Sequence, residues 1–322
     1  MIPSSLAVRS LLLLALALAP GCDRSGSAGE APGAGAPAGP RVDRPAFDSA
    51  RAFEHLRRQV AFGPRIPGSP GHAAQLQWMK DYLAARADTV VEQPFTHVTR
   101  SGRTLRMTNL FARFRPEAQD RVLLVAHWDT RPTSDQASGA DRDKPVPGAN
   151  DGASGVAVLL ELADMLKRKP AGIGVDLLLV DGEDYGPTGE DMYLGAKHFA
   201  ATLPAGYRPF YGVLLDMVGD RTPRFPVEAN SQRFAPEVVQ RVWSLAQEMG
   251  YGDVFPLSDG GQIEDDHVPL NQAGIRTIDI IDFDYGPGNR YWHTPQDVPE
   301  NTSAESLRIV GEVIAELVYR GG

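Results

Sequence analysis

The chain has 322 residues, enough for one large domain or two ordinary ones with a well-packed core. Its formal net charge of −9 at pH 7 gives it no electrostatic reason to bind nucleic acid or anionic lipid. Cys22 is its only cysteine, so no disulfide can form within the chain and stability must come from the core.

The first 21 residues have the layout of a secretory signal. Arg9 precedes an apolar block, residues 11–19, that is too short to span a bilayer. Cys22 follows directly, and this resembles a bacterial lipoprotein signal, which is cleaved before the cysteine that receives the lipid. A plain cleaved signal is the alternative. We expect an exported protein on the periplasmic or cell-surface side, held to the membrane only by a lipid on Cys22.

Residues 22–45 are rich in Ala, Gly, Pro and Ser and contain almost nothing to bury. This composition predicts a disordered tether. Residues 46–322 then form the catalytic domain, in which we see no repeat and no second domain.

The elements of this domain alternate between strand and helix patterns. Two helices, 46–60 and 71–87, are followed by two alternating strands, 89–98 and 104–114, that predict a hairpin-like edge. Short apolar runs of strand length then alternate with helical segments up to residue 281: strands 121–125, 176–180, 211–215 and 276–281, and helices 156–166, 194–201 and 235–249, with a last helix at 303–319. We predict a single α/β domain whose twisted, mostly parallel central sheet has helices on both faces.

Carboxylates and histidines follow the apolar runs. Glu183 and Asp184 come just after residues 176–180, and because neighbouring side chains diverge, Asp184 can bind a metal while Glu183 carries a proton. A solvated acidic turn is the plain alternative. His127 and Asp129 lie two apart after the strand at 121–125 and point to the same side, so Asp129 can orient His127.

Three further residues continue this pattern. Asp151 lies in a glycine-rich turn before a helix, where it faces a metal or merely caps the helix. Asp216 ends another buried strand, and His293 follows the last one. The carboxyl ends of such strands are where open α/β folds place their chemistry.

Taken together, six motifs in chain order resemble the zinc aminopeptidase clan, and more closely the animal-type glutaminyl-peptide cyclotransferases with their bacterial relatives. They are Ala126-His127-Trp128-Asp129-Thr130-Arg131-Pro132, Gly148-Ala149-Asn150-Asp151-Gly152-Ala153-Ser154-Gly155, Asp181-Gly182-Glu183-Asp184-Tyr185-Gly186, Leu215-Asp216-Met217-Val218-Gly219, Asp265-Asp266-His267 and Trp292-His293-Thr294. The resemblance covers residues 46–319 and implies a zinc-aminopeptidase-like fold.

The resemblance also implies a site. One Zn²⁺ per chain would be bound by Asp151, Asp184 and His293, with a fourth position open. Peptides or proteins beginning with Gln would be the substrates, cyclised to pyroglutamate with release of ammonia, and the protein would act as a monomer. The implied roles are proton transfer by Glu183, substrate binding by Asp216 and Asp265, and walls of the substrate pocket formed by Trp292 and His127.

This sequence departs from the animal pattern in three places. Asp184 replaces the commoner Glu, Asp279 lies where the animal enzymes have His, and the Trp expected soon after Asp184 is missing. All five ligand positions of a two-zinc aminopeptidase are also occupied, so an aminopeptidase is the alternative enzyme. A non-catalytic binding protein is the third reading, although such a relative is expected to lose Glu183. Trp292 directly before His293 and the Asp265-Asp266-His267 triplet favour the cyclase over the aminopeptidase. The plain alternatives for these residues are a core aromatic and a solvated acidic loop.

Overall fold

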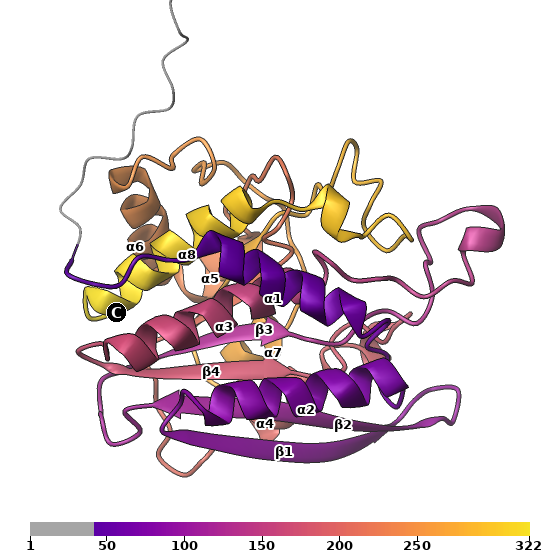
Figure 1. The fold of residues 1–322 in the computed structure, drawn as a ribbon, viewed down its shortest axis with the longest axis horizontal. Coiled ribbons are helices and arrows are strands. Elements are labelled where there is room, and N and C mark those ends of the chain that lie inside the picture. The colour runs from indigo at the N-terminus through magenta and orange to yellow at the C-terminus, as the bar shows by residue number, and fades with distance from the viewer. Residues whose placement is uncertain (1–41) are drawn as a thin grey trace, which may run out of the picture. The chain divides into compact units, whose positions relative to one another are not determined.

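The structure, a computed structural model, describes residues 42–322 (Figure 1). The predicted signal, Cys22 and the predicted tether up to residue 41 lie outside these residues. The end of that predicted tether is part of the fold. The main-chain N–H of Val42 donates to Glu316, and the buried Arg44 guanidinium forms ion pairs with Glu312 and Glu316. Two carboxylates of the last helix therefore hold residues 42–44, which form the end of the predicted tether.

A six-stranded sheet forms the centre of the described chain, with the strand order β1-β2-β4-β3-β5-β6. Strands β4, β3, β5 and β6 are parallel, whereas β1 and β2 form an antiparallel hairpin at one edge. The bounds are β1 Thr89–Val98, β2 Thr104–Phe114, β3 Arg121–His127, β4 Gly174–Val180, β5 Gly212–Asp216 and β6 Thr277–Ile281. This confirms the prediction of a mostly parallel sheet with a hairpin edge.

Helices cover both faces of the sheet, as predicted. Helices α1, α3 and α8 lie side by side over one face in Figure 1, and α2 and α6 pack into the same core. Helices α4 and α7 cover the other face, while α5 packs along β6. The bounds are α1 Ser49–Ala61, α2 Pro70–Ala84, α3 Ala153–Arg168, α4 Leu194–Ala201, α5 Ala229–Phe234, α6 Pro236–Glu248, α7 His267–Gln272 and α8 Ala304–Tyr319.

The alternation of side chains along β3 explains why helices are needed on both faces. Leu124 and Ala126 point into the larger core with α3, and Leu123 and Val125 point into the smaller core with Phe199 of α4. All of these side chains are fully buried. A strand that is apolar on both faces is stable only when both faces are covered.

The strand order indicates where on the sheet a functional site is expected. Strand β3 has β4 on one side and β5 on the other. The chain therefore crosses from β3 to one side of the sheet and then, after β4, to the other side. Ligands bind in open α/β sheets beyond the carboxyl ends of the strands at such a point. The segments after β3, β4, β5 and β6 all meet there. No helix within residues 42–322 is long and apolar enough to cross a membrane.

Candidate active site

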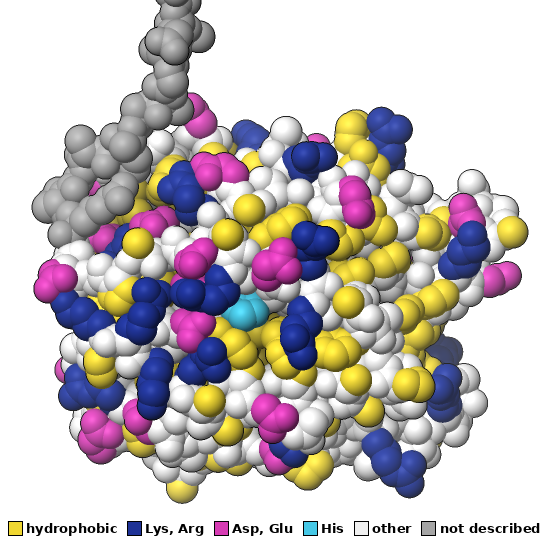
Figure 2. Space-filling view, viewed as in Figure 1, with side chains coloured by type: hydrophobic (Ala, Val, Ile, Leu, Met, Phe, Trp, Pro, Cys, Tyr) yellow, Lys and Arg dark blue, Asp and Glu magenta, His cyan; other side chains and the backbone are white. Residues whose placement is uncertain are grey.

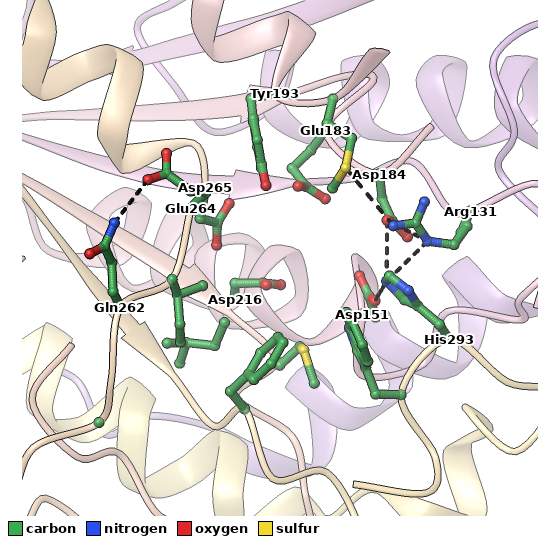
Figure 3. Close-up of a pocket in the computed structure, with 17 residues that line it drawn as sticks. Arg131, Asp151, Glu183, Asp184, Tyr193, Asp216, Gln262, Glu264, Asp265 and His293 are labelled. Atoms are coloured by element: carbon green, nitrogen blue, oxygen red, sulfur yellow. Dashed lines mark hydrogen bonds and ion pairs between the residues drawn. The ribbon is translucent and has the colours of Figure 1, made fainter. Parts of the chain in front are cut away.

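The carboxyl ends of the parallel strands surround a cavity of about 370 Å³ (Figure 3). Its buried floor contains four carboxylates from three different segments and one histidine from the loop after β6: Asp151, Glu183, Asp184, Asp216 and His293. Residues separated by more than 140 positions in the sequence thus meet in one place, as the strand-end pattern predicted.

Asp151, Asp184 and His293 form a group whose donor atoms suit a metal ion. His293 Nε2 lies 3.3 Å from Asp184 Oδ1 and 3.4 Å from Asp151 Oδ2. A tetrahedral zinc bound at about 2.0–2.1 Å would separate its ligand atoms by about 3.3–3.4 Å. The other oxygen of Asp184, Oδ2, is buried and has no hydrogen-bond partner among the described residues, which suits a ligand atom. The three residues therefore fit zinc.

The orientation of His293 also suits a metal ligand. Its Nδ1 lies 3.1 Å from Asp135 Oδ1, a contact that directs Nε2 towards the carboxylates. Burial alone would lower the pKa of His293, but the carboxylates of Asp184, Asp135 and Asp151 raise that pKa to about 11. The acidic surroundings therefore favour a positive charge at this position, whether it is a proton or a metal ion.

Arg131 places a positively charged side chain beside this group. Its Nε lies 3.1 Å from both His293 Nε2 and Asp184 Oδ1, and the side chain is buried. The motif containing Arg131 was recognised in the sequence, but no role was predicted for this residue. Only the approach of the β3 and β4 loops in space reveals its contacts.

The turn before α3 aims Asp151 at the metal group. Gly152 occupies the N-cap position of α3 with a φ of 97°, and no side chain caps the helix there. A side chain at Gly152 would collide with the main chain of Asp129. The alternative in which Asp151 merely caps the helix is therefore wrong.

Two further carboxylates hold the backbone of the acidic residues. Asp129 accepts hydrogen bonds from the main-chain N–H groups of Glu183 and Asp184, at 3.0 and 3.2 Å. Asp297 does the same for Asn150 and Asp151, at 2.7 and 3.2 Å. Asp129 Oδ1 also lies 3.6 Å from Nδ1 of His127, the residue that we predict it to orient.

His127 lies beneath the cavity and is not one of the residues that line it. Its Nε2 is 3.0 Å from Asp216 Oδ1 and 3.2 Å from Asp151 Oδ1, and only 1% of its surface is exposed. His127, which we predict as part of the pocket wall, thus lies behind the residues that line this cavity. The fully buried strand β3 ends at His127, and the two carboxylates cover its imidazole.

Glu183 lies between His127 and the open part of the cavity. Its Oε2 is 3.6 Å from His127 Nδ1, and the carboxyl group is buried. Burial raises the pKa of Glu183 well above its ordinary value; His127 opposes this effect, and Asp184, Asp265 and Asp266 add to it. A carboxyl group that gains and loses a proton at higher pH than usual suits general acid–base catalysis.

Asp265 and Trp292 line the same cavity. Asp265 is buried, and burial together with Asp216 and Asp266 raises its pKa well above the ordinary value. Asp279, whose role the sequence left open, is buried behind the cavity with no hydrogen-bond partner for either oxygen among the described residues. Trp292 stacks on His293 with ring centroids 3.8 Å apart.

Tyr193 is a cavity residue that no sequence pattern indicated. It precedes α4 in the left-handed conformation, with a φ of 58°, and its hydroxyl points into the cavity beside Glu183 (Figure 3). A positive φ is uncommon for a residue other than glycine and is a property of the backbone, which the residue type does not reveal.

Comparisons with known proteins agree with this site. Residues 109–318 match peptidase family M28. The glutaminyl cyclase of Bacteroides thetaiotaomicron is 35% identical, with a TM-score of 0.83 over 86% of this chain and 99% of that chain. A Zn-dependent exopeptidase of Parabacteroides distasonis is 37% identical, with a TM-score of 0.82 over 85% and 99%.

An animal protein also matches. The glutaminyl-peptide cyclotransferase of Gloydius blomhoffii is 27% identical over 292 residues, which is 79% of this chain and 76% of that protein. Because the family match extends over more than half of the chain, and the solved relatives are enzymes on the same fold, the chain is an enzyme of the zinc-dependent peptidase family M28 and a relative of the glutaminyl cyclases.

Proposed function

We propose that the chain is a glutaminyl-peptide cyclotransferase, which converts the N-terminal Gln of peptides or proteins to pyroglutamate. One observation carries this proposal: Glu183, Asp265 and Trp292 line the same cavity as the candidate metal ligands Asp151, Asp184 and His293. Cyclisation requires a folded substrate and little water, and a small cavity with a buried floor meets both needs.

In this reaction the α-amine of the substrate attacks the side-chain amide carbon of the same Gln residue. A carbon–nitrogen bond to the amine forms, the bond to the amide nitrogen breaks, and ammonia leaves. Glu183 accepts the proton that the amine loses and returns a proton to the departing nitrogen. Asp216 and Asp265 accept hydrogen bonds from the amine and the amide, and Trp292 keeps water from the reacting carbon.

Zinc held by Asp151, Asp184 and His293 would polarise the amide oxygen as a Lewis acid. The residues of the chain bind and orient the substrate around that group. Incubation of the purified protein with a Gln-initiated peptide, followed by mass spectrometry, tests the proposal. Loss of ammonia from the peptide is the expected result, whereas loss of a whole residue would identify an aminopeptidase.

A two-zinc aminopeptidase is the alternative, because His127, Asp151 and Glu183 form a second group of potential ligands. The two readings differ at His127 Nε2, which lies 3.0 Å from Asp216 Oδ1: a single-zinc site keeps this direct contact, whereas a second zinc would replace it.

We expect one tightly held zinc per chain. Metal analysis of the purified protein should give one equivalent, and Asp184→Ala should lose it because one of three protein ligands is removed. A matched control is Asp216→Ala, which should retain the zinc. Two zincs at full occupancy, both needed for activity, would favour the aminopeptidase.

We also propose that the protein is exported, anchored by a lipid on Cys22 and monomeric. The signal-like residues 1–21 and the position of Cys22 support the anchor. In Cys22→Ser, the protein should move from the membrane fraction to the soluble or unprocessed fraction and keep its turnover of Gln-initiated peptides. Mass spectrometry of the N-terminal fragment should find no lipid. A variant that still fractionates with membranes would exclude this anchor.

A further inference from the structure

The cavity has a buried floor and an exposed mouth, and the two have different chemistry. The residues at the floor are covered, whereas three of the residues that line the cavity are exposed: Gln262, Glu264 and Phe283. When the N-terminal Gln of a substrate reaches Glu183, the rest of the peptide must therefore extend out through this mouth. The side chain of the second residue is then the one nearest to the mouth.

Glu264 brings an unneutralised carboxylate to the mouth. Its Oε1 accepts a hydrogen bond from Gln262 Nε2 at 3.3 Å, and Figure 3 shows this pair on the other side of the view from His293. Among residues 42–322, no Lys, Arg or His side chain forms an ion pair with Glu264. Arg131, a cation that lines the cavity, is engaged by Asp184 instead.

Phe283 brings an aromatic surface to the same mouth. Its side chain is 40% exposed, and it meets Trp292 at a ring-centroid distance of 4.9 Å and an interplanar angle of 61°. An exposed aromatic ring attracts the cationic end of Lys or Arg and packs against the apolar stem. A carboxylate and an aromatic ring at one opening thus match both parts of a basic side chain.

We propose that this mouth selects peptides in which the N-terminal Gln is followed by Lys or Arg. The inference rests on the proposed cyclase function and names the substrate class of that site. Because ion pairs and cation–π contacts at exposed positions are individually weak, we expect a preference of about three- to tenfold in kcat/KM. The preference should shrink as the salt concentration rises.

The test compares ammonia release from three peptides that differ only at the second residue: lysine, Nε-acetyl-lysine and glutamate. The acetylated residue keeps the stem and loses the charge. The unaltered protein should prefer lysine over acetyl-lysine and acetyl-lysine over glutamate. Glu264→Gln should lower the first ratio towards the part that Phe283 contributes, and Glu264→Lys should reverse the order of the charged peptides.

Glu117→Gln is the matched control, because it removes the same charge from an exposed side chain in the segment between β2 and β3. Its peptide preference should equal that of the unaltered protein. Equal kcat/KM for all three peptides, or an unchanged preference in Glu264→Lys, would overturn this inference and leave the cyclase function standing. Ammonia release from none of the peptides would overturn both.

Discussion

Glu183→Gln should lower kcat for Gln-initiated peptides by about 10²–10⁴-fold, the usual contribution of a general acid–base group. The substitution keeps the size of the side chain but removes the carboxylate that accepts the proton. Zinc should remain bound, because the candidate ligands are Asp151, Asp184 and His293 and the 183–184 backbone is held by Asp129. Steady-state ammonia release and metal analysis on the same sample measure both effects.

Glu161→Gln would be a poor control for this variant, because Glu161 is a buried partner of Arg51. Glu117→Gln changes an exposed carboxylate and suits the purpose. If Glu183→Gln lost its zinc while its fold remained intact, Glu183 would be the ligand. The roles of the two neighbouring carboxylates would then be reversed.

The regular elements of the fold were predictable from local patterns. The alternating segments 89–98 and 104–114 and the helix 194–201 coincide with β1, β2 and α4. The short helices α5 and α7 were missed, since six residues carry too little periodicity to reveal a helix. The strand order was also not predictable, because it depends on which side of β3 each crossover takes.

The grouping of the site was predictable for a physical reason. Parallel strands end at the same edge of a sheet, so His127, Glu183 and Asp216 had to lie near one another. The supporting contacts were not predictable. Asp129 is 54 positions from Glu183, and Asp297 is 146 positions from Asp151. Such long-range contacts leave no local pattern in the sequence.

Asp265→Ala and Trp292→Ala should each lower cyclisation strongly, by about 10²-fold or more, because small errors in position cost that much in rate. Correct positioning of the two reacting groups can lower the activation barrier of a well-oriented intramolecular reaction by roughly 7–11 kcal/mol. Each of these two side chains should supply part of that positioning. One oxygen of Asp265 accepts the N–H of Asp266, at 2.5 Å, and the carboxyl group lines the cavity. Zinc content should not change in Asp265→Ala, and Asp265→Asn tests whether an acceptor is needed.

Trp292 should also control the access of water, since its indole lines the cavity and stacks on His293. In Trp292→Ala, water should reach the amide carbon and compete with the amine, so that part of the product is a Glu-initiated peptide. Trp292→Phe should keep an apolar wall and give less of this product. Mass spectrometry separates pyroglutamate from glutamate at the N-terminus. Full cyclisation without hydrolysis in Trp292→Ala would remove Trp292 from the site, and loss of zinc would assign it to the support of His293.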